Sequence, residues 1–467
     1  MRREWSIGRI AAAALASVAL AAIGPTGAQA ETLSSALAKA YRNNPQLNAQ
    51  RAVVRQIDET VPQALSGYRP QISATADVGV QYQDARTSSA LGGSGRQQST
   101  TYPRGVGLTA TQTLFNGLRT GNQVRSAESN VRAARETLRV FEQQVLFDAA
   151  TSYMNMLRDT ALVQLQRSNV EVLTEQLRQT RDRFNVGEVT RTDVAQAESR
   201  LAAARSALLA AEATLNTSRA TYRRVIGEDP VNLAPGSPVD RLSPRSLDVA
   251  VAKGQAQNPN VTAAMYGVDV ATLQVKIAEG ALYPVVTLQG NLQQNWETSA
   301  QTSRSFAASA VVGVTFPLYQ GGAEYATIRQ QKELLGQRRL DLDAVRDQAR
   351  ATVVEAWGQL LAARSQIESA QAQVNAAEIA LNGVREEARV GQRTTLDVLN
   401  QQQELVNARV ALVTAQRDRV VASYALLAAI GNLNPQVLGL PTPVYDPQTH
   451  YHQVRDAWSG VRTPDGR

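Results

Sequence analysis

Side chains that could carry covalent chemistry are scarce in this sequence. The chain has no cysteine, which excludes disulfide bonds, thiolate catalysis and thiolate metal sites. Its two histidines, His450 and His452, lie in a polar C-terminal segment, so none remains elsewhere for a catalytic triad. The adjacent acids Glu386 and Glu387 fall in a helical pattern and are best explained as solvated charges. The sequence has neither a metal-ligand cluster nor a glycine-rich phosphate loop, so it predicts no catalytic, cofactor-binding or metal site and no enzyme.

Charged and small residues gather instead at two similar turns, residues 186–194 and 390–399. Each turn begins with a Val-Gly pair, and Gly187 and Gly391 permit a tight connection between two helices. Judged alone, Arg393 in the second turn is one more solvated charge at a helix end, and exposed charges of this kind contribute little to stability.

These turns belong to an internal duplication. A fixed offset places landmarks of the first copy on similar residues of the second, in the same order. The matching pairs are Leu114–Gly117 with Leu318–Gly321, Val186-Gly187 with Val390-Gly391, Asp193-Val194 with Asp397-Val398, and Ile226-Gly227 with Ile430-Gly431. Chance is a poor explanation for such agreement, so we expect one repeat at 31–230 and another at 248–435. Repeats that cannot bury their faces alone need a neighbour.

Each copy contains two segments in which apolar and polar residues alternate, as in strands with one apolar and one polar face. They lie at about 71–82 and 105–115 in the first copy, with a longer glycine-rich insert between them, and at about 285–296 and 306–318 in the second. Strands of about 9 to 11 residues are long enough to cross a bilayer. A water-soluble sandwich shows the same alternation, but here each strand pair leads directly into a very long helical pattern.

Four strands cannot close a barrel in lipid, because the open edges would leave backbone groups without hydrogen bonds. Closure therefore requires several chains, and three chains would supply twelve strands, within the usual range for outer-membrane barrels.

Two long stretches without proline are free to form helices. We expect helices at about 122–184, 190–226, 322–388 and 394–430, with apolar residues at spacings of three and four that suit coiled-coil packing. At about 1.5 Å per residue, the first of these helices is on the order of 90 to 100 Å long. The apolar stripe on so long a helix requires partner helices.

The ends of the chain have their own composition. Residues 1–30 combine early arginines, an apolar alanine-rich run and small residues at Ala28-Gln29-Ala30, which predicts a cleaved secretory signal and a mature chain beginning at Glu31. Residues 231–247 form a linker between the copies, and 436–467 form a C-terminal extension. The formal net charge of +7 is small for 467 residues and does not call for a nucleic-acid partner.

The duplication, the helix–strand–strand–helix order and the paired turns together resemble the TolC family of outer-membrane efflux and secretion channels. The resemblance covers the chain from Leu33 to about Pro435. It implies a mainly helical homotrimer with four strands per chain, in which a transmembrane 12-strand β-barrel continues into a 12-helix coiled-coil α-barrel across the periplasm. Substrates would arrive from an inner-membrane transporter of the ABC or RND type through a periplasmic adaptor, or membrane fusion, protein, and the duct would lie in outer-membrane lipid.

The resemblance also implies roles for residues at the two turns. The turns would form the periplasmic tip, where Arg393 would bond across to Thr192 and Asp193 and hold the closed state. Gly187 and Gly391 would lie where adaptor hairpins dock, in addition to shaping the turns.

Two positions depart from the family pattern. Asp397 matches the first of two acidic rings that often line the constriction, but the second position is Asn400. A tyrosine that often joins the closing network is replaced by Ala388. Three Asp397 carboxylates near one axis would still repel one another and attract a cation. Because of these two departures, the sequence does not decide how tightly the gate closes or how strongly it holds cations.

The sequence favours an export duct for small molecules or unfolded proteins, as in a tripartite efflux pump or a type I secretion system. A periplasmic coiled-coil adaptor or scaffold is the alternative. It would explain the helical hairpins, but not four bilayer-length strands with alternating faces. The sequence does not select between drugs and secreted proteins as cargo.

Overall fold

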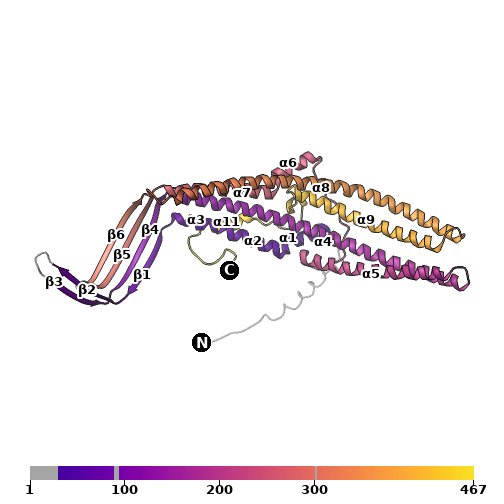
Figure 1. Ribbon diagram of the computed structural model, residues 1–467, viewed down its shortest axis with the longest axis horizontal. Helices are drawn as coiled ribbons and strands as arrows, with labels where there is room; N and C mark the ends of the chain where they lie inside the picture. Colours follow the sequence, from indigo (N-terminus) through magenta and orange to yellow (C-terminus); the bar gives the residue numbers. More distant parts are fainter. Residues whose placement is uncertain (1–29, 89–93, 300–301, 467) are drawn as a thin grey trace, which may run out of the picture. The chain divides into compact units, whose positions relative to one another are not determined.

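The computed structural model describes residues 30–88, 94–299 and 302–466. The predicted leader, apart from residue 30, and residues 91–93 of the glycine-rich insert lie outside these ranges. The longer helices are α1 (Leu33–Asn43), α2 (Pro45–Asp58), α3 (Thr60–Leu65), α4 (Arg119–Asn185), α5 (Arg191–Ile226), α6 (Leu247–Gln257), α7 (Pro259–Glu279), α8 (Ala323–Arg389), α9 (Thr395–Ala429), α10 (Pro435–Leu438) and α11 (Pro447–Val454) (Figure 1). The strands are β1 (Gln71–Val78), β2 (Gln81–Ser88), β3 (Ser94–Thr101), β4 (Arg104–Asn116), β5 (Val285–Ser299) and β6 (Thr302–Thr315).

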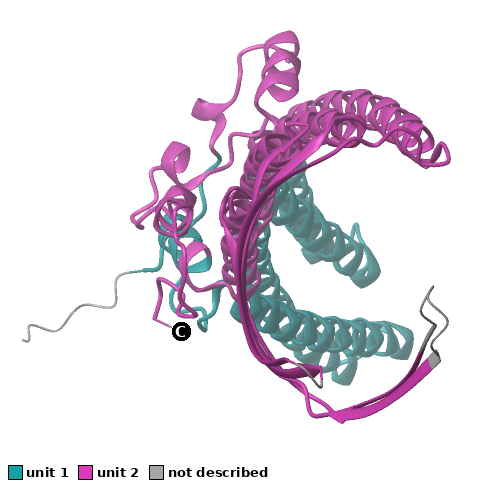
Figure 2. Ribbon diagram, turned by 90° about the vertical axis from the view of Figure 1, so that its left-hand side faces the viewer, with its two compact units in different colours: residues 1–40, 148–238, 366–421 teal, residues 41–147, 239–365, 422–467 magenta. Residues whose placement is uncertain are grey.

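The chain divides into two compact units (Figure 2). Unit 1 comprises residues up to 40, 148–238 and 366–421, and it holds the turn ends of the helical hairpins α4–α5 and α8–α9. Unit 2 comprises 41–147, 239–365 and 422–467, and it holds the strands together with the helical segments that adjoin them.

Four strands of unit 2 form one antiparallel sheet in the order β1-β4-β5-β6. The register aligns residues of one kind in rows across all four strands. One face carries the rows Ala74, Leu108, Leu292, Ala308 and Ile72, Ala110, Gly290, Ala310. The other face carries Ser73, Thr109, Asn291, Ser309 and Asp77, Gly105, Asn295, Ser305. The alternation of each strand thus gives the sheet one mainly apolar face and one mainly polar face.

The first strand pair is longer than the sequence predicted. The strand expected at 71–82 is interrupted after Val78, and pairing resumes at Gln81 opposite Thr101 to give the β2–β3 ribbon. The interruption lies at Pro103, which has no N–H to donate and accepts a bond from the Gly79 N–H at 2.9 Å. Apart from Tyr82 and Ala85 the ribbon is polar, so beyond Tyr82 no alternation of apolar residues marked it as a strand. The sheet therefore has the four strands that were expected, and the ribbon adds two more.

Other boundaries differ by a few residues. β6 begins at Thr302, four residues before the expected start, and ends at Thr315 rather than at residue 318. The early end follows from Pro317, which has no N–H to donate to a strand ladder. The four long helices begin and end within three residues of the predicted positions.

The helices pack through the apolar stripes. Val131 and Leu138 of α4 are each 2% exposed, whereas Phe141 in the same stripe is 41% exposed, so the stripe is not buried along its whole length. In unit 2, Val261 of α7 packs with Leu342 and Ala349 of α8. Within the described ranges, no helix combines the length and the apolar character needed to cross a membrane.

The two copies begin their strand-leading helices in the same way. Asn44 caps α2 by accepting bonds from the N–H groups of Gln46 and Leu47, and Asn258 caps α7 by accepting one from Asn260. Each cap is followed by a proline at the first helical position, where a missing N–H costs nothing. The Asn-Pro pair therefore ends one helix and starts the next in both copies.

A glycine substitution tests the turn that joins β4 to α4. Gly117 has φ +69°, and a Cβ there would overlap the backbone carbonyl of Gly280. Gly391 has a similar φ of +77°, but the space around it is open. Gly391→Ala should lose about 1–2 kcal/mol to the left-handed backbone alone. Gly117→Ala should lose roughly 1–3 kcal/mol more because of the overlap. Thermal unfolding of both variants measures the difference, and equal losses would contradict the close approach at Gly117.

The C-terminal extension is held against the start of the chain within unit 2. His450 of α11 lies 3.1 Å from Asp58 of α2, and both side chains are buried. Arg135 of α4 contacts the same carboxylate at 3.8 Å and lies over the ring of Tyr451. Burial raises the pKa of the Asp58 carboxyl. The contacts with His450 and Arg135 lower this pKa, but by less than burial raises it.

Asp58→Ala is expected to release α11. The substitution removes the hydrogen-bond partner of His450 and the carboxylate that faces Arg135 at 3.8 Å, at a cost of about 1–3 kcal/mol. Hydrogen exchange of the α11 amides should speed up accordingly, and trypsin should cut after Arg455 more readily. Asp58→Asn is the matched control, because an amide oxygen can still accept from His450. Unchanged exchange in Asp58→Ala would contradict this attachment.

The same carboxyl sets a pH dependence. Because its pKa is raised in the folded chain, the folded state holds this proton more tightly than the unfolded chain does. The contribution of Asp58 to stability is therefore fully present below its unfolded pKa of 3.8 and falls as the pH rises through the raised value. Comparing the chain with Asp58→Asn across this window should isolate the decline, which the amide cannot show.

Candidate functional site

The two helix turns of unit 1 have the same backbone geometry. Gly187 lies in the left-handed region at φ +82° and donates its N–H to Phe184 O at 3.0 Å. The next N–H, that of Glu188, reaches back to Arg183 O at 2.9 Å, as expected where a helix ends on a left-handed glycine. The turn at Gly391 repeats both bonds at 3.2 and 2.9 Å.

Each turn is followed by a reciprocal cap at the next helix. Thr190 Oγ1 accepts from Asp193 N at 3.3 Å, while Asp193 Oδ2 accepts from Thr190 N at 2.9 Å. Thr394 and Asp397 make the same pair of bonds at 3.3 and 3.0 Å. Bonds from Thr190 lower the pKa of Asp193, and bonds from Thr394, first its backbone N–H, lower that of Asp397. Both predicted gate acids are thus helix-capping residues held in the ionised form.

Arg393 has a different partner from the one that the family resemblance implied. Its Nε donates to Glu387 Oε2 at 2.9 Å, within its own α8–α9 hairpin. This bond, strengthened by the charge of Glu387, raises the pKa of Arg393. The structure does not bring Arg393 to Thr192 or Asp193 of the same chain. Thr192 is exposed, and Asp193 is engaged in its cap.

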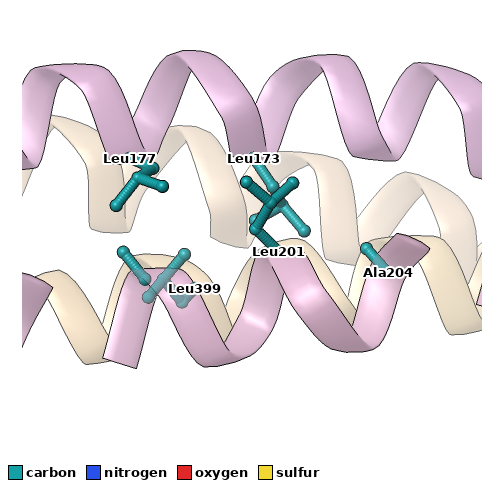
Figure 3. Close-up of a cluster of buried hydrophobic side chains, with 6 residues drawn as sticks. Leu173, Leu177, Leu201, Ala204 and Leu399 are labelled. Carbon is teal, nitrogen blue, oxygen red and sulfur yellow. The ribbon is translucent and has the colours of Figure 1, made fainter. Parts of the chain in front are cut away.

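Asn400 joins the two hairpins of unit 1. Its side-chain oxygen accepts from Arg200 Nη2 at 2.7 Å, which connects α9 of the second copy to α5 of the first. Its neighbour Leu399 is 2% exposed and belongs to a cluster with side chains of both α4 and α5. Figure 3 shows Leu399 facing Leu177 and Leu201. Asn400 occupies the position where the family pattern has a second acid. It makes a polar contact between the hairpins, and Leu399 beside it makes an apolar contact.

Other polar bonds at the tips stay within one hairpin. Arg181 Nη2 bonds to Glu198 at 2.6 Å between α4 and α5, and the equivalent Arg385 bonds to Gln402 at 3.0 Å between α8 and α9. Ala388 packs at the edge of an apolar cluster of the second hairpin. Among the tip bonds described here, the Arg200–Asn400 bond is the one that can oppose separation of the two hairpins.

Sequence reasoning missed four residues of this site. Thr190 and Thr394 carried a signal, since threonine three residues before an acid is a capping pattern. Glu387 stood in the sequence as an adjacent acid but had no marked partner. Arg200 gave no signal, because the chain has 48 basic residues and spacing does not select among them.

The site holds exposed glycines, acids that cap helices, and a hydrogen bond between the two hairpins. In the described ranges, no group of three or more histidine and acidic side chains could hold a metal ion. The two exposed valines beside the glycines, Val186 and Val390, leave apolar surface at the turns.

Comparisons with known proteins agree with this architecture. The model of the family described as outer membrane efflux protein matches residues 36–228 and 251–432. The outer membrane efflux protein BepC of Brucella suis is 44% identical over 444 residues, which cover 94% of each chain. The outer membrane protein TolC of Vibrio cholerae is 27% identical over 87% of this chain and 92% of its own.

A solved structure shares the fold. The CmeC outer membrane channel of Campylobacter jejuni superimposes with a TM-score of 0.75 at 16% identity, over 91% of this chain and 89% of that one. The fold is therefore the TolC-like one. Because the family model matches most of the chain in two segments and a relative is 44% identical along nearly its whole length, the chain belongs to the outer membrane efflux protein family and is an outer-membrane efflux or secretion channel.

Proposed function

We propose that three copies of this chain form an export duct whose strands close into one barrel in the outer membrane. The observation that carries the proposal is the register of the sheet, which places apolar rows on one face and polar rows on the other. The apolar face would contact lipid, and the polar face would line the channel. A strand of 14 residues such as β6 is long enough to cross a bilayer when tilted.

The two edges of the sheet support closure between copies. β1 and β6 are the end strands in the order β1-β4-β5-β6, and successive strands are antiparallel, so β1 and β6 run in opposite directions. β6 of one copy can therefore pair with β1 of the next in the antiparallel sense. In lipid such pairing is needed, because an open edge would leave backbone groups without partners. Three copies would give a closed barrel of twelve strands.

The helical hairpins would continue the duct and gate it at their turns. Within each chain, the gate would rest on the Arg200–Asn400 bond and on Leu399 in its apolar cluster. Between chains, Arg393 could exchange Glu387 for Thr192 or Asp193 of a neighbouring copy, and Asp397 would supply one carboxylate per chain near the axis. Opening would separate the α8–α9 hairpin from the α4–α5 hairpin.

The turns would also receive a periplasmic adaptor protein. A Cβ at Gly187 or Gly391 would meet no atom within 4 Å, so both glycines offer open backbone surface. Val186 and Val390 beside them are both 72% exposed, an unusual exposure for valine. An adaptor hairpin that covers these valines would link the duct to an inner-membrane transporter of the ABC or RND type. The duct itself would perform no covalent chemistry and would bind no nucleic acid.

The first test is the assembly state and conductance of the purified protein. Detergent-solubilised protein should have the mass of three chains by light scattering and should form discrete pores of low conductance in a planar bilayer. A monomer recovered from the periplasm without detergent would favour the coiled-coil scaffold instead. Trimers that conduct no ions under any condition would contradict the transport role while leaving the barrel intact.

A further inference from the structure

The described part of the C-terminal extension runs along α2 and α3 toward the sheet. Arg51 lies between the rings of Tyr41 and Tyr445, at 4.6 and 5.1 Å from their centres. Further along, His450 meets Asp58 at 3.1 Å. These contacts follow the same direction on both segments. The extension therefore advances in parallel with α2 toward the start of β1.

The extension reaches the sheet at Trp458 and then turns back. The guanidinium of Arg69 lies 4.6 Å from the centre of the Trp458 ring, and its Nη1 donates to Ala457 O at 2.8 Å. After Trp458 the chain runs back along α2, since Asp465 forms an ion pair with Arg55 at 3.6 Å. Residues 458–462 thus form the apex of a loop, and Figure 1 shows the end of the chain bending back below α3. In the view of Figure 2, the C-terminus lies on the convex side of the curved sheet.

The apex exposes apolar side chains that water disfavours. Trp458 is 73% exposed and Val461 is completely exposed, and an exposed arginine, Arg462, follows them. Tryptophan has an apolar body and a polar N–H, and it is enriched where a bilayer meets water. An adjacent arginine can pair with lipid phosphate, since guanidinium binds phosphate well.

The apex lies at one end of the apolar face of the sheet. Arg69 is two residues before β1, whose first apolar-face residue is Ile72. Other exposed aromatic residues stand at the same end of the strands, before β1 and β5 and after β6. They are Tyr68, Tyr283, Phe316 and Tyr319. Trp296 stands at the opposite end of β5, thirteen residues from Tyr283, which at about 3.3 Å per residue and a tilt of about 40° corresponds to roughly 33 Å across the bilayer.

We propose that residues 458–462 contact the phospholipid headgroups on the periplasmic side of the outer membrane, with Trp458 at the boundary between headgroups and acyl chains. Arg69 positions Trp458 by stacking on its ring and holding the preceding carbonyl. The extension thereby becomes a membrane-contacting strap that fixes the depth of the sheet in the bilayer. The inference rests on the proposed placement of the sheet in lipid.

Quenching of tryptophan fluorescence by brominated lipid tests the contact. The whole chain would carry Trp458 as its single tryptophan, with Trp5, Trp296 and Trp357 replaced by Phe. Trimers would be reconstituted in vesicles of phosphatidylethanolamine and phosphatidylglycerol brominated near the headgroup. Two reference chains would carry a single tryptophan elsewhere: Phe306→Trp on the apolar face of β6, and native Trp357 in α8.

The expected result is that Trp458 loses about as large a fraction of its emission as Phe306→Trp, while Trp357 keeps its own. Adding Arg69→Gln to the single-Trp458 chain should shift the Trp458 emission to longer wavelength and reduce the quenching. Quenching of Phe306→Trp but not of Trp458 would overturn the strap and leave the barrel. Trp458 shielded from both lipid and iodide would place it against a neighbouring copy and also overturn the contact. No quenching at Phe306→Trp would refute the placement of the sheet itself.

Discussion

Replacing Leu292 with arginine is expected to prevent assembly of the chain in the outer membrane. Leu292 lies in the middle of the apolar face, in one row with Ala74, Leu108 and Ala308. An arginine that faces lipid near the centre of a barrel costs about 2–4 kcal/mol in each chain. A trimer bears this cost three times. The whole stability of a typical domain is only about 5–15 kcal/mol, so the loss should be decisive.

The neighbouring residue supplies a matched control. Asn291 is adjacent in sequence, but its side chain lies in the polar row with Ser73, Thr109 and Ser309. Asn291→Arg adds the same charge to the opposite face, where water in the channel can solvate it. This variant should assemble normally, and its ring of three arginines should reduce the passage of cations.

Heat-stable trimer in outer-membrane fractions measures the first effect, and ion selectivity in a planar bilayer measures the second. If Leu292→Arg yields as much trimer as Asn291→Arg, the apolar face does not contact lipid. If Asn291→Arg alone blocks assembly, the two faces have been assigned the wrong way round.

Removing the Arg200 side chain is expected to raise the single-channel conductance several-fold. The Arg200–Asn400 bond of 2.7 Å connects α5 to α9, so its loss removes a polar contact that holds the two hairpins together. The effect is present in every copy of the proposed trimer, and contacts that are weak singly can together shift a gating equilibrium. Asn400→Ala should produce a similar increase, because it removes the acceptor of the same bond.

Two further variants identify which contacts form the gate. Arg385→Ala removes a bond of similar length, to Gln402, but this bond lies within the α8–α9 hairpin. The conductance of Arg385→Ala should match that of the unmodified protein. Arg393→Ala also breaks a bond within one hairpin, the one to Glu387. A higher conductance in Arg393→Ala would therefore indicate a contact with a neighbouring chain.

These outcomes separate the alternatives for the gate. An increase in Arg200→Ala and Asn400→Ala but not in Arg393→Ala would place the gate inside each chain, and an increase in Arg393→Ala alone would place it between chains. If all four variants conduct as the unmodified protein does, the protein is still a channel, but these contacts do not hold it closed. In each case the amount of trimer in the membrane serves as the control for folding.

Local patterns of residues were enough to predict the strands, the long helices and the turns of this protein. Alternating residues in β1, β4, β5 and β6 predicted two-faced strands, and spacings of three and four predicted the long helices within a few residues. These periods follow from the backbone geometry of helices and strands, so the spacing of apolar residues in the sequence reveals them. The glycines at positions 187 and 391 likewise predicted the left-handed turns that the structure has.

The pairing of polar residues, in contrast, follows from the way in which the helices pack. The sequence placed charges at the tips, but it could not pair Arg200 with Asn400, 200 residues away, or choose Glu387 over Asp193 for Arg393. It also gave no sign that Trp458 would meet Arg69, because an isolated tryptophan in a polar tail has no period. A charged side chain can bond to any acceptor that the fold brings within reach. Its partner is therefore set by the packing of the helices, to which its own local sequence contributes little.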